Sequence, residues 1–293
     1  QAEDYFNSQP GLEDEYRFDL APVITLPKPA AYYGANYSDR KDVLLHEAVR
    51  YACSKSKIDF SPYDNDFDGS VDNVFLITAG FSEADGAGET WIWPQFGQLR
   101  DHGGTGEAGG LTIDNFCVST ELSSDEGDIP APAHVGVFCH EFCHFLGLTD
   151  LYDTDGESSG GVAPGLWNTG IMDNGSKSSP VPGLCALDLE LLGKGKCNKL
   201  TKGSHTLQPL GRTGEYLKCA AENENEFFLF ECKEGRGLAI YHVDRSSQAA
   251  GWSDYYQKEL TAAERWDFSQ VNCRPDRQCA ALLAASSEPD GLF

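Results

Sequence analysis

The residues best suited to chemistry lie in one short stretch, His-Glu-Phe-Cys-His at 140–144, which has the pattern HExxH. On a helix, residues four apart share a face, so His140 and His144 can present both imidazoles to one metal ion, with Glu141 beside them. Imidazoles are typical zinc ligands, and a neighbouring carboxylate can act as a general base towards water. The stretch therefore predicts a zinc hydrolase. The alternative is a chance HExxH on a solvated helix.

The residues after the motif favour the catalytic interpretation. Gly147 stands where the helix should end, and glycine tolerates the left-handed conformation that a sharp turn requires. Asp150 follows three residues later and can turn back as a third ligand, which leaves a fourth position for water. Asp153 is the rival for that role. His102 and His134 are weaker candidate ligands, because such histidines are frequent at protein surfaces.

The chain has one methionine, Met172, in the turn-rich sequence Gly-Ile-Met-Asp-Asn-Gly downstream of Asp150. A solitary methionine is usually core filler. Its position after the extended motif, however, is similar to that of the Met-turn beneath the metal of metzincin peptidases. We therefore expect Met172 to form an apolar floor and to donate nothing to the metal.

Longer strings carry a resemblance to one family. HEFCHFLGLTDLYD and LWNTGIMDNGS resemble segments of the immune inhibitor A family of secreted metallopeptidases, as do YDNDFDGSVD at 63–72, GFSEADGAGETWIWP at 80–94 and GLAIYHVD at 237–244. The resemblance implies a zinc endopeptidase made with a signal peptide and a pro-segment, and hence as a zymogen. Family members often have Gly at the position of Cys143 and Pro at that of Thr149, and neither difference removes an expected ligand.

The expected reaction is hydrolysis of peptide bonds in protein or peptide substrates. Zinc held by His140, His144 and Asp150 would activate a water molecule and polarise the scissile carbonyl. Glu141 would take the water proton and pass it to the leaving amine. Two alternatives stay open: a binding or adhesive module that keeps the fold without turnover, and a zinc amidase acting on non-protein substrates. Retention of Glu141 argues against the first.

A second constellation has the pattern DxDxDGxxD, which suits a hard cation because alternate side chains of a tight loop converge. Its members are Asp64, Asp66, Asp68, Gly69 and Asp72. It is not an EF-hand, because Phe75 occupies the position of the bidentate glutamate. An acidic solvated turn is the alternative, although four aspartates without an ion would repel one another. We predict a structural calcium site.

The formal net charge of −24 argues against general attraction to nucleic acid or anionic membranes, and no apolar run suffices to span a bilayer. The ten cysteines are an even, scattered set, which favours disulfides. Cys273 and Cys279 form the easiest local pair, whereas Cys139 and Cys143 need separate partners. We expect a monomeric secreted or cell-surface protein, and the start at Gln1 suggests a mature or trimmed form.

The fold class expected is α+β and zincin- or metzincin-like, with a twisted mixed sheet, an active-site helix and a β-rich C-terminal subdomain. A catalytic domain would span 1–199 and the subdomain 200–293. Helices are expected at 42–55, 133–146 and 184–192, with a long functional loop at 153–183. Strands are expected at 23–26, 74–79, 111–118, 206–210, 216–220, 227–232 and 238–243, with 111–118 as an edge strand that could hold an extended peptide.

Overall fold

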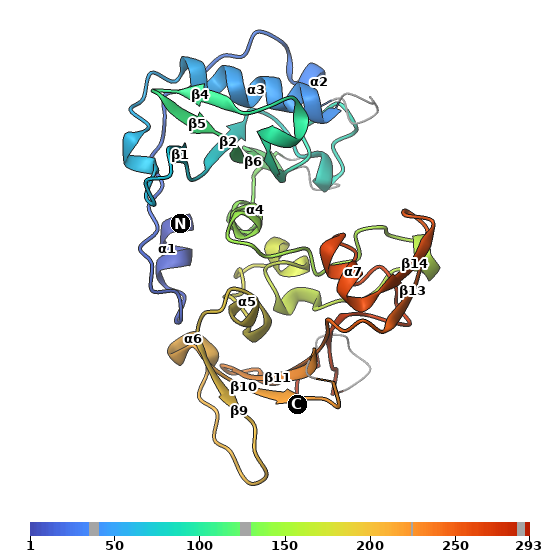
Figure 1. Cartoon of the computed structure of the whole chain (residues 1–293). Helices are drawn as coiled ribbons and strands as arrows, with labels where there is room; N and C mark the ends of the chain where they lie inside the picture. The colour runs from blue at the N-terminus through green and yellow to red at the C-terminus, as the bar shows by residue number, and fades with distance from the viewer. Residues whose placement is uncertain (35–40, 124–129, 224, 286–290) are drawn as a thin grey trace. The chain divides into compact units, whose positions relative to one another are not determined.

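The computed structural model describes residues 1–34, 41–123, 130–223, 225–285 and 291–293 (Figure 1). The chain is a mixed α+β protein with several small sheets and few helices. It divides into two compact units, which we call the N-terminal unit (Phe18–Phe145) and the C-terminal unit (Gln1–Arg17 with Leu146–Phe293). The domain boundary expected after residue 199 lies within the C-terminal unit and stays a prediction.

The described residues of the N-terminal unit form three sheets. A three-stranded sheet has the order β2-β6-β3, in which β2 is parallel and β3 antiparallel to β6. A smaller sheet has the order β1-β5-β4, and β7 pairs with β8. Their bounds are β1 Ser70–Val71, β2 Val74–Thr78, β3 Gln95–Gln98, β4 Gly106–Ala108, β5 Leu111–Ile113, β6 Asn115–Thr120, β7 Leu122–Ser123 and β8 Ala131–Pro132.

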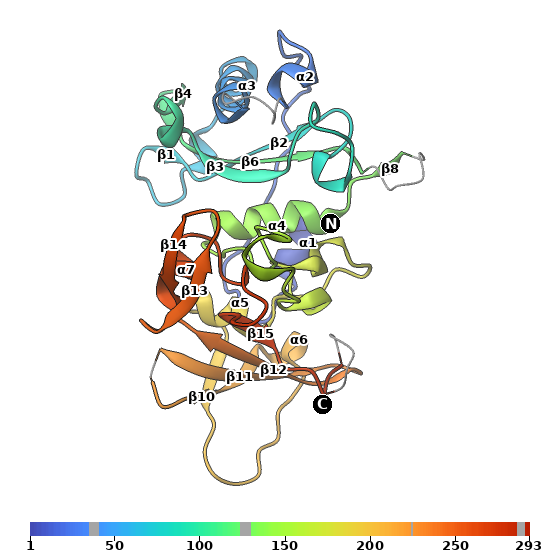
Figure 2. The same cartoon turned by 90° about the vertical axis from the view of Figure 1, so that its right-hand side faces the viewer.

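Helices lie on both sides of the β2-β6-β3 sheet, with α3 and α4 opposite each other (Figure 2). Phe116 and Val118 of β6 belong to the core on the side of α3, and the intervening Cys117 contacts α4. Alternate residues of one strand thus serve two faces, as a strand covered by helices requires. The helical segments are α2 Ala30–Tyr33, α3 Lys41–Lys55, α4 Val135–Phe145, and the 3-10 turns η1 Ser61–Tyr63, η2 Glu83–Asp85 and η3 Leu99–His102.

Two strand predictions for this unit are wrong. Residues 111–118 form parts of two strands in different sheets, and β6 is central rather than an edge strand. The break falls at the buried Asp114, whose carbonyl accepts from Leu99 N–H and whose carboxylate accepts from Arg100 N–H, both at 2.9 Å. Residues 23–26 form no strand: Val23 is 99% exposed, and only Leu26 packs against the core.

The C-terminal unit is built on a five-stranded sheet of order β15-β12-β11-β10-β9, antiparallel except for the β9-β10 pair. A β13-β14 hairpin lies apart from it. The strands are β9 Lys196–Lys199, β10 Glu215–Ala220, β11 Glu226–Lys233, β12 Gly237–Asp244, β13 Ala249–Ser253, β14 Lys258–Thr261 and β15 Ala280–Leu282. The helical segments are α1 Ala2–Asn7, α5 Ala186–Leu191, α6 Leu210–Thr213, α7 Ala262–Asp267, η4 Ser158–Gly160, η5 Trp167–Thr169 and η6 Asn174–Lys177.

Most elements expected in this unit are found. The strands predicted at 216–220, 227–232 and 238–243 are β10, β11 and β12, and the helix predicted at 184–192 is α5. The strand predicted at 206–210 is wrong. Only Pro209 makes a bridge there, to Cys232, and helix α6 begins at the next residue, Leu210, which ends any extended segment. Across the described residues, no helix is both long and apolar enough to cross a bilayer.

The predicted disulfides are not found, because all ten cysteines, each of them described, are thiols. Seven of the ten are buried and pack as small apolar groups. Burial raises the pKa of Cys139 to about 12 and that of Cys279 to about 11, which keeps both thiols protonated. The sulfur of Cys273 contacts the hydroxyl of Thr154 at 3.1 Å.

Candidate metal centre

The helix that carries the HExxH motif begins directly after His134. The ring Nδ1 of His134 accepts the N–H of Gly136 at 3.3 Å, and its carbonyl accepts the N–H of Val137 at 3.0 Å. These bonds satisfy two of the donors that a helix N-terminus leaves without intrahelical partners. His134 therefore caps α4, and it does not lie in the candidate ligand group.

The face of α4 that lies opposite its two histidines packs through aromatic contacts. Phe138 stacks on Phe75 with ring centroids 3.9 Å apart, and Phe18 packs edge-on against Phe138 and Phe142. His140 follows Phe138 by two residues, which places it about 200° further round the helix. The same packing that places Phe138 on Phe75 of the sheet thus turns the histidines away from the sheet.

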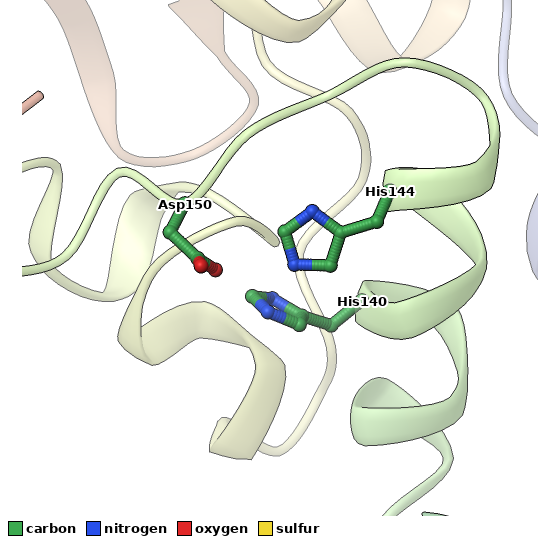
Figure 3. A group of neighbouring side chains, drawn as sticks. All are labelled: His140, His144 and Asp150. Carbon is green, nitrogen blue, oxygen red and sulfur yellow. The ribbon is translucent and has the colours of Figure 1, made fainter. Parts of the chain in front are cut away.

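The three predicted zinc ligands come together. One ligand atom each from His140, His144 and Asp150 lies within 4.8 Å of the others, and Figure 3 shows the two rings and the carboxylate directed towards one another. The two rings meet edge to face with centroids 4.8 Å apart. Zinc takes N and O ligands at about 2.0–2.2 Å, so two ligands of one ion lie within about 4.4 Å. The donor set therefore fits zinc with small side-chain adjustments.

Glycine and a methionine shape the chain after the helix. Gly147 has a φ of +107°, so the positive φ expected of the turn is present. Leu151, directly after Asp150, donates its N–H to the carbonyl of Met172 at 2.8 Å. Met172 is fully buried. The backbone of the predicted Met-turn thus anchors the loop that carries the third candidate ligand.

The rival aspartate is engaged elsewhere. Asp153 accepts the backbone N–H of Asp155 at 3.1 Å and that of Ala163 at 2.8 Å. It belongs to a different group of potential ligands, with Asp155 and Cys273. Within the described part of the chain, Asp150 and not Asp153 lies with the two histidines.

The remaining candidate histidine also has another role. The ring of His102 stacks on that of His46, with centroids 4.2 Å apart, and its carbonyl accepts from Arg50 at 3.1 Å. His102 is absent from the ligand groups formed by the described residues.

The aspartate loop is assembled in part. Ligand oxygens of Asp64, Asp66 and Asp68 lie within 4.8 Å of one another, whereas Asp72 is not in the group. Asp72 instead accepts from the side-chain amide of Asn65. Backbone N–H groups also donate into the loop, including that of Asp68 to Asp64 at 3.0 Å.

Two residues beside the candidate centre escaped sequence reasoning. Asn272 donates its side-chain amide to the carbonyl of Leu151 at 2.7 Å, and Cys273 joins Asp153 and Asp155. Both lie far along the chain from the HExxH motif. Asn272 belongs to no recognisable local pattern, and Cys273 was expected only as a disulfide partner of Cys279. Only the folded arrangement brings them close.

Comparison with known proteins agrees with the resemblance seen in the sequence. No curated protein matches the chain. Residues 1–191 match the family model described as immune inhibitor A peptidase M6, catalytic domain. The matched region includes α4 together with Asp150 and Met172 and covers 191 of the 293 residues, well over half. The chain therefore belongs to the immune inhibitor A family of metallopeptidases.

Proposed function

We propose that the chain is a zinc-dependent endopeptidase of the metzincin type. His140, His144 and Asp150 would bind the zinc, and Glu141 would be the general base. The observation that carries this proposal is the convergence of the three ligand atoms within 4.8 Å. Two imidazoles and a carboxylate form a donor set suited to catalytic zinc, which keeps one position for water.

The chain's own residues account for the proton transfers. Zinc bound here would supply Lewis-acid activation of a water molecule and of the scissile carbonyl. Glu141 follows His140 directly and is 5% exposed, so bulk water has little access to its carboxylate. It would hold the water proton and release it to the leaving amine. The thiol of Cys117 donates to the Glu141 carbonyl at 3.3 Å and helps to fix this turn of α4.

The base is tested by Glu141→Gln, which keeps the shape of the side chain and removes its basicity. We expect zinc content to be unchanged and the rate of casein or peptide cleavage to fall by about 10²–10⁴-fold. Glu107→Gln, at an exposed residue of strand β4, is the control and should cleave like the unmodified chain. Full activity in Glu141→Gln would contradict the proposal that Glu141 is the general base.

The third ligand is tested by comparing Asp150→Ala with Asp153→Ala. Asp150→Ala should lose zinc on dialysis, because only the two imidazoles of His140 and His144 remain as ligands. The second should keep zinc but unfold at a lower temperature, since the N–H groups of Asp155 and Ala163 lose their acceptor. The zinc content of each variant is measured after dialysis. Zinc loss in Asp153→Ala but not in Asp150→Ala would make Asp153 the third ligand instead.

We further propose that Asp64, Asp66 and Asp68 bind calcium. Support comes from their clustered oxygens, which suit a hard cation. Calcium should raise the melting temperature of the chain, and Asp66→Asn should weaken that effect, whereas the exposed Asp101→Asn should not. A melting temperature that does not respond to calcium would contradict the assignment.

An extracellular location is part of the same proposal. It is supported by the resemblance to secreted peptidases and by the acidic net charge of −24. Expression in the native host should place the chain in the culture medium or at the cell surface. Recovery of the chain only from the cell interior would contradict the extracellular location but not the proposed peptidase activity.

A further inference from the structure

We propose that Asn272 is a positioning residue for Asp150, the third zinc ligand of the proposed function on which this inference rests. Asn272 lies outside the matched residues 1–191, between α7 and β15. Its side chain is fully buried. It would act by holding the backbone of Leu151, the residue directly after Asp150.

The amide of Asn272 makes two bonds of opposite kind. Its Nδ2 donates to the carbonyl of Leu151 at 2.7 Å, and its Oδ1 accepts the N–H of Ala280 at 3.0 Å. A carbonyl needs a donor and an N–H needs an acceptor, so these partners define one orientation of the amide. Because Leu151 N–H also donates to the Met172 carbonyl at 2.8 Å, both backbone polar groups of Leu151 are held.

The space around the Leu151 carbonyl is filled. A Cβ on Gly165 would lie 2.4 Å from that oxygen and 3.3 Å from Nδ2 of Asn272. Leu151 itself is fully buried. In the intact chain, the Leu151 carbonyl is therefore enclosed by Gly165 and by the amide of Asn272, which is its hydrogen-bond donor.

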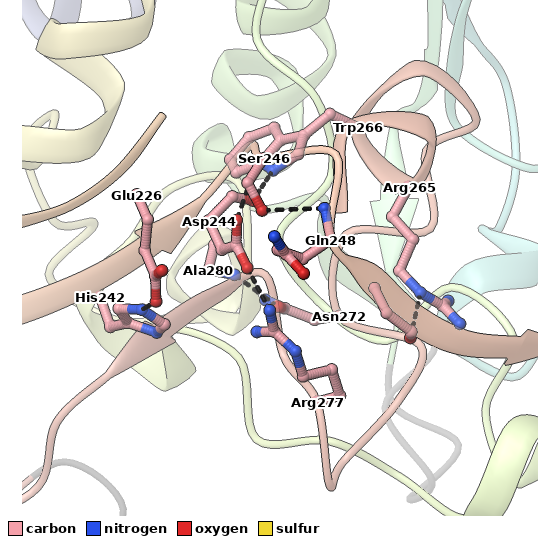
Figure 4. A network of polar contacts seen from close by, with 11 residues as sticks. Glu226, His242, Asp244, Ser246, Gln248, Arg265, Trp266, Asn272, Arg277 and Ala280 are labelled. Carbon is pink, nitrogen blue, oxygen red and sulfur yellow. Dashed lines mark hydrogen bonds and ion pairs between the residues drawn. The ribbon is translucent and has the colours of Figure 1, made fainter. Parts of the chain in front are cut away.

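The residue that donates to Oδ1 of Asn272 belongs to the five-stranded sheet of the C-terminal unit. Ala280 is the first residue of β15 and pairs with Val243 of β12. The neighbouring Asp244 is fully buried and accepts from the guanidinium of Arg277, as Figure 4 shows beside Asn272 and Ala280. Asn272 therefore links the loop of Asp150 to a strand whose place is fixed by its ladder.

This link predicts an effect on metal affinity. Removing a group that orients a metal ligand through hydrogen bonds typically lowers metal affinity by about 10–100-fold. In Asn272→Asp, the new carboxylate could still accept from Ala280, but it would place an oxygen against the Leu151 carbonyl. In Asn272→Ala, both bonds are lost. In both variants, the loop that carries Asp150 should be held less firmly and should unfold locally more often.

The experiment uses the full chain and two readouts. Zinc affinity is measured by competition with a chromophoric chelator, and amide hydrogen exchange is followed in the metal-free chain over residues 148–152. The matched control is Ser246→Ala. Ser246 is also fully buried in this part of the unit, and its hydroxyl accepts from Gln248 N–H at 3.2 Å. We expect both Asn272 variants to exchange faster at Leu151 and to bind zinc about 10–100-fold more weakly, with Ser246→Ala unchanged in both.

Each other outcome overturns the inference. If the unmodified chain binds zinc and the Asn272 variants bind it equally well, the positioning role is wrong and the proposed function stands. If Ser246→Ala weakens zinc binding as much, the effect is general destabilisation. If the unmodified chain binds no zinc, the proposed function fails and the positioning role fails with it.

Discussion

Two aspartates three residues apart have different partners at this centre. Asp150 lies with the histidines, whereas Asp153 accepts backbone N–H groups from the loop that follows it. The N–H groups of Asp155 and Ala163 hold the Asp153 carboxylate in a different group of side chains, with Asp155 and Cys273. Hydrogen bonding, rather than residue type, therefore distinguishes the two aspartates.

Gly165 offers a test of how tightly the loop of Asp150 is packed. Its φ is +56°, and a Cβ there would lie 2.3 Å from Oδ2 of Asp173 and 2.4 Å from the Leu151 carbonyl. Gly165→Ala should therefore destabilise the chain by more than the roughly 1 kcal/mol expected of strain alone. Denaturant unfolding measures the loss, and zinc affinity should fall with it.

Gly156→Ala separates strain from contact. Gly156 has a similar φ of +63°, but a Cβ there would meet nothing within 4 Å. It should lose only the strain energy, about 1 kcal/mol. Equal losses in the two variants would show that the surroundings of Leu151 can relax.

At the level of elements, the parts of the fold that depend on nearby residues could be predicted from the sequence. Helix α4 and the turn at Gly147 follow from apolar spacing and a glycine, both of which are local. The division of 111–118 at Asp114 depends on Leu99 and Arg100, and the role of Asn272 depends on Leu151. Such long-range partners leave no periodic signal, so the sequence could not predict them.

Helix α5 contains a buried acid that should make stability depend on pH. Asp188 is fully buried, and burial raises its pKa to about 6 from the usual 3.8, despite a bond from Cys185 N–H. The folded chain therefore holds this proton more tightly than the unfolded chain. The stabilising contribution of Asp188 is complete below about pH 3.8 and is lost as the pH rises to about 6.

Asp188→Asn should remove this pH dependence. A shift of about two units corresponds to about 3 kcal/mol, so the variant should gain up to that amount relative to the unmodified chain between pH 4 and 7. Urea unfolding across that range is the measurement. The exposed Glu259→Gln should follow the unmodified profile, and an Asp188→Asn profile equal to it would disprove the assignment.

At the scale of the whole chain, the C-terminal unit joins segments from both ends. Gly195 donates to the Gly11 carbonyl at 3.3 Å, and the hydroxyl of Tyr5 donates to the Pro182 carbonyl at 3.0 Å. The matched residues end at 191, inside this unit and at the last residue of α5. The family match therefore covers less than the folded unit that holds Asp150.

A chain cut after residue 191 should consequently fail to fold cooperatively. The cut would expose Ala186, Leu187 and Leu189 of α5, each at most 1% exposed in the intact chain. It would also remove Glu231, which accepts from Ala186 N–H, and Asn272. Residues 1–191 should show no cooperative melting transition and little zinc affinity by calorimetry and chelator competition. A chain ending at Leu283, which keeps β15, should retain both. Cooperative melting with full zinc affinity in residues 1–191 would instead mean that the matched region folds and binds metal without the C-terminal sheet.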